Sequence, residues 1–282
     1  FAFADVNGVE YSDMGHPIFV AIVYSLFGHN VIVVRIFHAL ISAYMCILIY
    51  RLTARNFGEM PARYAAIIAM LFHNFIYYCG LHLKETNMIF LTVLFLERAD
   101  YALRGQKFTF SSMVIPILSG FAIFFFRTVL GAVLWMAFFG AILLSADRTM
   151  STGRRIFIGF LMFLSAATMF TGKIENQVKE YWEAKDTNQS TSMEWRSERE
   201  GGNKLAKYGS ATLFAPAIFI IPIPTMVNID TQQNQMLQNG GFLEKDVLSF
   251  FVYIALSALI FRYKSWRRHL LILLFIAGYL TV

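Results

Sequence analysis

The chain has 282 residues, of which 57% are hydrophobic and only 15% are charged. A soluble domain averages about 25% charged residues, so the composition argues against a soluble globular protein. The net charge of +6 comes largely from short basic loops between apolar runs, a pattern typical of membrane topology and not of nucleic-acid binding.

The apolar runs predict helices that cross a membrane. A helix needs about 20 residues to span a bilayer, and most of the runs approach that length. They cover residues 31–50, 64–83, 86–97, 108–126, 128–146, 156–171, 211–229, 247–261 and 270–282. We therefore predict an all-α fold, a polytopic transmembrane helix bundle with about eight or nine membrane helices. Its expected parts are an N-terminal bundle over 1–171, an extracytoplasmic loop region over 172–246 and further membrane helices over 247–282.

The N-terminal part begins with a polar and aromatic segment, 1–16. The apolar stretch Pro17–Phe27 that follows is too short to cross, so we expect a helix in the outer interface that ends at Gly28-His29-Asn30. Residues 31–54 should then run inward, Gly58 and Pro61 should break the chain, and 62–80 should return outward.

The long apolar stretch 108–146 has room for two spans, and it divides at Arg127. Arg127 is therefore expected at the outer turn of a helical hairpin. Residues 172–210 balance basic with acidic side chains and predict a solvated outer loop. The segment Ala211–Ile229 contains three prolines and is expected to be re-entrant. Because the chain starts at Phe1 and ends in an apolar run, we expect a fragment of a longer protein.

Basic residues gather in alternate loops. Under the positive-inside rule, the loops 51–63, 98–107, 147–155 and 262–269 are expected to be cytoplasmic. The sparse loop 80–85 and the segment 172–210 then face outside. The expected location is a bacterial inner membrane, with any active site on the periplasmic face.

Isolated charges in apolar surroundings are the first candidates for chemistry. Lys84-Glu85 sits where two apolar runs meet, and it reads equally well as a phosphate-binding lysine beside an acid or as a solvated turn. Arg127 stands alone between two apolar runs. It either meets a phosphate, a carboxylate or backbone carbonyls, or it reaches the outer headgroups.

Other polar residues give weaker signals. Glu10, Asp13 and His16 precede the interfacial helix, where one of them could serve as a general base, although a plain polar loop is the simpler interpretation. His82 shares the outer turn with Lys84. The remaining histidines His29, His38 and His73 are scattered, and the two cysteines Cys46 and Cys79 lie in apolar runs, so neither set predicts a metal site or a disulfide framework.

Ordered short motifs over residues 12–104 carry a family resemblance. They are Gly15-His16-Pro17-Ile18-Phe19, Leu26-Phe27-Gly28, Arg35, Tyr50, Ala54-Arg55-Asn56-Phe57-Gly58, Tyr77-Tyr78, Gly80-Leu81 and Lys84-Glu85. Their order and spacing resemble the GT-C superfamily of membrane glycosyltransferases, closest to the glycosyltransferase family 39-like group of protein O-mannosyltransferases and lipid A aminoarabinose transferases.

This resemblance implies a polyprenyl-phosphate-linked sugar as donor, the lipid bilayer as surroundings, and a glycan, lipid or protein acceptor, with no nucleic acid. It implies no organic cofactor and leaves a divalent metal open. The family's catalytic aspartate is expected upstream of Gly15, so Glu85 and Asp13 are only secondary catalytic candidates. The candidate substrate- and phosphate-binding residues are Lys84, Arg127, His16 and His82.

Two other classes of protein stay open. A polysaccharide polymerase or ligase of the O-antigen type is also multi-pass and uses functional arginines on the outer face. A transporter or flippase would show internal repeats and charges at the bilayer midplane, and the sequence displays neither.

Overall fold

The computed structural model describes residues 5–6, 9–10, 14–81, 83–104, 110–144, 251–252, 254–262 and 266–281. This part of the chain is almost entirely helical, as predicted. The only strands in these ranges are β1 (Asp5–Val6) and β2 (Val9–Glu10), a two-residue antiparallel pair. The predicted outer loop 172–210 and the re-entrant segment Ala211–Ile229 lie outside the described residues.

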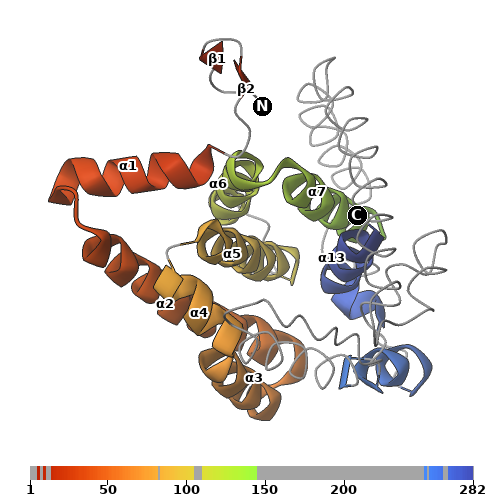
Figure 1. Cartoon of the computed structure of the whole chain (residues 1–282). Coiled ribbons are helices and arrows are strands. Elements are labelled where there is room, and N and C mark those ends of the chain that lie inside the picture. Colours follow the sequence, from red (N-terminus) through yellow and green to blue (C-terminus); the bar gives the residue numbers. More distant parts are fainter. Residues whose placement is uncertain are drawn as a thin grey trace, which may run out of the picture. The chain divides into compact units, whose positions relative to one another are not determined.

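Helices α1 (Gly15–Phe27) and α2 (Val31–Phe57) meet at a sharp corner (Figure 1). Gly28 makes the corner with φ of 79°, a conformation that side chains disfavour. Asn30 then caps α2, because its Oδ1 accepts a hydrogen bond of 2.9 Å from the Ile32 backbone N–H. The predicted helix end at 28–30 is confirmed.

Helix α2 has the length and composition of a membrane span. Its 27 residues extend for about 40 Å at 1.5 Å per residue, more than the roughly 30 Å hydrocarbon core. Within the described ranges it is the one helix that is both long and apolar enough to cross a membrane, while α1 and three further apolar helices are shorter. Gly58 caps its C-terminal end with φ of 92°, and the Gly58 N–H donates a hydrogen bond to the Ala54 carbonyl.

The segment after α2 differs from the prediction in two ways. Pro61 does not break the chain but lies in the first turn of α3 (Glu59–Leu71), where the missing N–H of proline costs no helical hydrogen bond. The expected single run over 62–80 is divided at Phe72 into α3 and the short α4 (His73–Leu81), because Phe72 takes an extended conformation with ψ of 104°.

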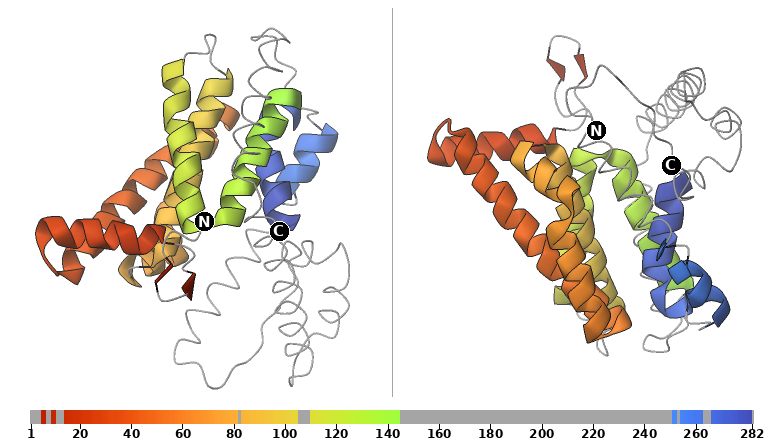
Figure 2. Two further views of the ribbon diagram at one scale, coloured as in Figure 1. Left: turned by 90° about the horizontal axis from the view of Figure 1, so that it is seen from above. Right: turned by 60° about the horizontal axis from the view of Figure 1, so that its bottom comes forward.

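Helices α6 (Phe110–Phe126) and α7 (Thr128–Leu144) form the predicted hairpin, with Arg127 at its turn. A Cβ built on Gly120 would lie 3.0 Å from the Trp135 ring, and one on Gly131 would lie 3.0 Å from the Phe124 ring. Both pairs are centred on the Arg127–Thr128 link, so the helices run antiparallel in close contact, side by side in Figure 2. The two glycines therefore permit the approach.

Helix α5 (Lys84–Arg104) lies at the centre of the first helices and contacts α2, α6 and α7. Phe95 is fully buried and meets the rings of Trp135 at 6.0 Å and Phe138 at 5.7 Å between centroids. The buried core thus combines aromatic side chains of α5 and α7 with aliphatic ones of α2, among them Val34, Met45 and Leu48.

Two compact units divide the chain. The first holds residues 1–164 with 267–280 and 282, and the second holds 165–266 with 281. The C-terminal elements are the π-helix η1 (Ala258–Arg262), the 3-10 helix η2 (Trp266–His269) and α13 (Leu270–Thr281).

Candidate functional site

The start of α1 meets the turn of the α6–α7 hairpin. A Cβ built on Gly15 would lie 2.7 Å from the ring of Phe126, the last residue of α6. Only glycine therefore allows this approach without a shift of the ring. The contact brings the Gly15-His16 motif to the end of the bundle that holds Arg127.

Lys84 and Glu85 are the first two residues of α5 and lie at that same end. Helices α5 and α6 run antiparallel, because Gly120 lies against Phe95 and the two residues are almost equally far along the chain from the short link between these helices. Since α7 runs antiparallel to α6, it is parallel to α5. Counting back along both helices puts Lys84 level with the hairpin turn. Lys84 and Glu85 are half-buried and Arg127 is exposed. Asp13 and His82 lie outside the described residues.

Two histidines come together here, namely the candidate His16 and His38, which the sequence showed only as scattered. The ring of His16 lies 5.8 Å from that of His38, and Phe19 stacks on His38 at 5.4 Å. His38 is completely buried, as expected for a core histidine. Their spacing of 22 residues on two helices gave no sequence signal, because only the Gly28 corner folds α1 back toward α2.

Buried polar atoms accumulate at the Lys84 end. Thr86 and Asn87 are each 4% exposed. Within the described part of the chain, Thr86 Oγ1, Asn87 Nδ2 and Ser42 Oγ on α2 have no hydrogen-bond partner. Burying a polar group without a partner costs about 1–3 kcal/mol of folding free energy. These three groups therefore destabilise the fold unless a ligand or a water molecule hydrogen bonds to them.

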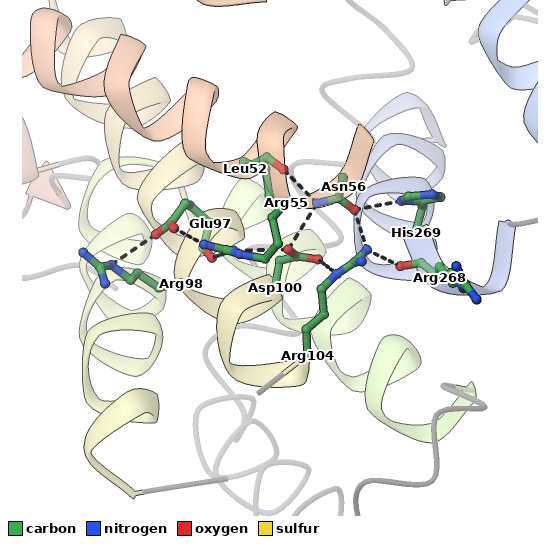
Figure 3. A network of polar contacts seen from close by, with 9 residues as sticks. All are labelled: Leu52, Arg55, Asn56, Glu97, Arg98, Asp100, Arg104, Arg268 and His269. Atoms are coloured by element: carbon green, nitrogen blue, oxygen red, sulfur yellow. Dashed lines mark hydrogen bonds and ion pairs between the residues drawn. The ribbon is translucent and has the colours of Figure 1, made fainter. Parts of the chain in front are cut away.

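A second polar cluster occupies the opposite end of the bundle and ties α2 to α5 (Figure 3). The Arg55 guanidinium pairs with the carboxylate of Glu97 and, at 3.2 Å, with Asp100. Glu97 and Asp100 are 2% and 4% exposed. A buried carboxylate needs such a partner, because an isolated buried charge would be strongly unfavourable.

Asn56 extends this cluster to the C-terminal helix. Its Nδ2 donates to the Leu52 carbonyl at 2.9 Å and to Asp100 at 3.1 Å, while its Oδ1 accepts from Arg104 and faces Nδ1 of His269 at 2.7 Å. Arg104 also donates to the Arg268 carbonyl at 2.6 Å. All four hydrogen-bonding positions of the Asn56 amide are thus used. We call the residues Arg55, Asn56, Glu97, Asp100, Arg104 and His269 the basal cluster.

The neighbours of His269 favour its neutral form. Burial, and then the positive charge of Arg104, lower the pKa of His269 from its usual value of 6.5. A neutral imidazole that donates from Nδ1 fits the acceptor Asn56 Oδ1. In the described part of the chain, Glu97 Oε2 has no hydrogen-bond partner but pairs with the Arg98 guanidinium at 3.2 Å. Each charged group of the basal cluster thus has an opposite charge beside it, as expected for a structural connection.

The basal cluster corrects the prediction for the basic loops. Arg51 and Arg55 lie in α2, Arg63 in α3, and Arg98 and Arg104 in α5, so most of 51–63 and 98–107 is helical. The sequence analysis missed the acidic partners. The available signal was Glu97 and Asp100, three residues apart and hence on one face of a helix, next to an apolar run.

In the ranges that the structure describes, no three His, Cys, Asp or Glu side chains are grouped as metal ligands would be. No family model, no curated protein and no solved structure matches this chain.

Proposed function

We propose that this chain is a membrane glycosyltransferase that moves a sugar from a polyprenyl-phosphate donor to an acceptor on the outer face of the membrane. The observation that carries the proposal is that Gly15-His16, Lys84-Glu85 and Arg127 lie at the same end of the helices. These residues come from three separate parts of the sequence. Most of them belong to the motifs that resemble the GT-C superfamily.

A membrane location is supported by α2 and by the apolar outer surface. Leu26, Leu40, Leu118 and Met136 are each more than half exposed, and contiguous exposed apolar surface suits lipid contact. The basic residues Arg51 and Arg63 lie at the end opposite Lys84, consistent with a cytoplasmic basal end. We propose a multi-pass protein of about eight or nine spans in a bacterial inner membrane, with the Lys84 end on the periplasmic side.

The proposed chemistry needs positive charge at the leaving group. As the acceptor hydroxyl attacks the anomeric carbon, the bond to the lipid phosphate breaks and negative charge grows on the phosphate oxygens. We assign the stabilisation of that charge to Lys84 and Arg127. We assign to Glu85 the secondary role of accepting the hydroxyl proton.

The buried charges of the basal cluster do not favour a transporter. Glu97 lies about 20 Å along α5 from Lys84, at 1.5 Å per residue, and so lies toward the C-terminal end of the helix. A transporter is expected to hold its ionisable groups near the bilayer midplane. A polymerase or ligase of the O-antigen type remains the second proposal, since it shares the outer arginine.

Transfer assays on the full-length protein test the proposal. Lys84→Ala and Arg127→Ala should each reduce transfer from a polyprenyl-phosphate sugar by about 10- to 1000-fold, the order seen when one transition-state donor is lost. Arg63→Ala at the basal end should leave turnover unchanged. Transfer that is equally fast in all three variants would contradict the proposal. Dependence on a diphosphate-linked oligosaccharide donor instead would favour the polymerase.

A further inference from the structure

Three buried polar side chains near Lys84 have no role in the proposed phosphate site. They are Ser42 on α2 and Thr86 and Asn87 on α5. Thr86 and Asn87 are more than nine-tenths buried, and in the ranges that the structure describes Thr86 Oγ1, Asn87 Nδ2 and Ser42 Oγ lack hydrogen-bond partners.

The packing of α2 on α5 puts these side chains at one level. Arg55 of α2 pairs with Glu97 and Asp100 of α5, and Tyr44 lies 6.1 Å from Phe90 between ring centroids. Tyr44 precedes Arg55 in α2, and their partners follow the same order in α5, so the two helices run parallel. A residue of α2 therefore lies level with the residue of α5 that is about 44 positions later in the sequence. The same offset puts Ser42 at about the level of Thr86 along the two helices.

Buried hydroxyls elsewhere in these helices are satisfied. Thr92, further along α5, donates to the Met88 carbonyl at 2.8 Å. Ser119 on α6 donates to the Ile115 carbonyl at 2.8 Å. The unpartnered set near Lys84 is therefore not a general property of hydroxyls in this bundle, and it calls for a local reason.

The chemistry of the set points to a neutral ligand with hydroxyl groups. Hydroxyls both donate and accept, and an amide NH₂ donates, which suits the hydroxyl groups of a sugar. None of the three carries charge, so they complement a phosphate less well than Lys84 does. We infer that Ser42, Thr86 and Asn87 hydrogen bond to the sugar of the donor, while Lys84 holds its phosphate. This inference rests on the proposed function.

Binding to two matched lipids tests it. The full-length protein in nanodiscs is titrated with undecaprenyl phosphate and with undecaprenyl phosphate carrying glucose, galactose or mannose, and native mass spectrometry gives each Kd. Thr86→Val and Asn87→Leu should weaken binding of the preferred sugar-carrying lipid by about tenfold each, the loss of roughly one hydrogen bond. Both should bind the sugar-free lipid as the wild type does. Thr92→Val is the matched control and should change neither Kd.

The possible results separate the two proposals. A wild-type protein that binds none of these lipids contradicts the proposed function itself. If the wild type binds the sugar-free and sugar-carrying lipids equally, or if Thr86→Val and Asn87→Leu bind them as the wild type does, the sugar site is wrong and water satisfies these atoms. An equal loss for both lipids also overturns it, because the side chains would then act on the phosphate or on folding.

Discussion

Nδ1 of His269 lies 2.7 Å from Oδ1 of Asn56, across a separation of 213 residues. Asn56 lies in the last turn of α2, and His269 immediately precedes α13. Together with the bond from Arg104 to the Arg268 carbonyl, this contact anchors the start of α13 on the basal ends of α2 and α5. The basal cluster thus holds α2, α5 and the start of α13 together at one end, while the proposed chemistry lies at the opposite end of α2 and α5.

Replacing Arg55 should be far more harmful than replacing Arg63. Arg55→Ala removes the cation that Glu97 and Asp100 share and leaves Glu97 only Arg98, at 3.2 Å, and Asp100 only Arg104 and Asn56. This loss at two buried carboxylates should lower the free energy of unfolding by up to about 3–5 kcal/mol. Arg63 pairs with Glu59 at the surface, where the side chains are 64% and 53% exposed, so Arg63→Ala should cost no more than about 1 kcal/mol. Thermal unfolding in detergent measures both. Equal losses would show that the basal cluster is not a buried ion-pair network.

The folded protein should lose stability in acid because of His269. Because the pKa of His269 is lowered in the folded protein, the unfolded chain takes up the proton first as the pH falls. Stability should thus be constant above pH of about 6.5 and decline below it. His269→Asn keeps a donor near the position of Nδ1 but cannot titrate, so its stability should not show this decline below about pH 6.5. An unchanged pH profile in the variant would assign the acid sensitivity to other groups.

Gly120 should tolerate no side chain. An added Cβ would lie 2.9 Å from Phe95 and 3.0 Å from Trp135, so Gly120→Ala should destabilise the protein by about 1–3 kcal/mol through overpacking. Gly80→Ala is the control, because a Cβ there meets no atom within 4 Å and alanine favours helix by up to about 1 kcal/mol. Calorimetry of both variants checks the difference. A stable Gly120→Ala protein would mean that α5, α6 and α7 are less closely packed.

Unpartnered hydroxyls should be dispensable for stability. In delipidated protein, Thr86→Val replaces a buried hydroxyl that lacks a partner in the described ranges, so the variant should be more stable by about 1 kcal/mol. Thr92→Val removes a hydroxyl bonded to the Met88 carbonyl and should be less stable by about 1 kcal/mol. Chemical denaturation measures the change in the free energy of unfolding for each variant, and the two changes should have opposite signs. Destabilisation by Thr86→Val would show that its hydroxyl is already satisfied.

The two ends of the bundle should lie on opposite sides of the membrane. Arg63 and Arg127 are both exposed, so single cysteines at these positions, with Cys46 and Cys79 replaced by serine, can react with an impermeant maleimide. The thiol of Arg127→Cys should react in intact cells, and that of Arg63→Cys only after the membrane is opened, following the positive-inside rule. Reaction of both cysteines in intact cells would overturn the proposed topology.

Local features of the sequence determined where the helices end. Gly28 and Gly58 adopt positive φ, which glycine accepts at little cost, so both breaks were predictable from residue type. The hairpin at Arg127 followed from the length of the apolar stretch, which has room for two helices. The break at Phe72 was not predictable, because Phe72 has no intrinsic preference against helix strong enough to mark it.

Only the tertiary structure decided which side chains meet. The sequence placed the arginines in loops, but it held no information on which face of α2 turns toward α5, and so the pairing of Arg55 with Glu97 and Asp100 was invisible. The link from Asn56 to His269 and the common level of Ser42 and Thr86 have the same origin. Helix propensity and apolar length act over neighbouring residues, whereas these contacts depend on the register and direction of helices that are far apart in the chain, which packing alone fixes.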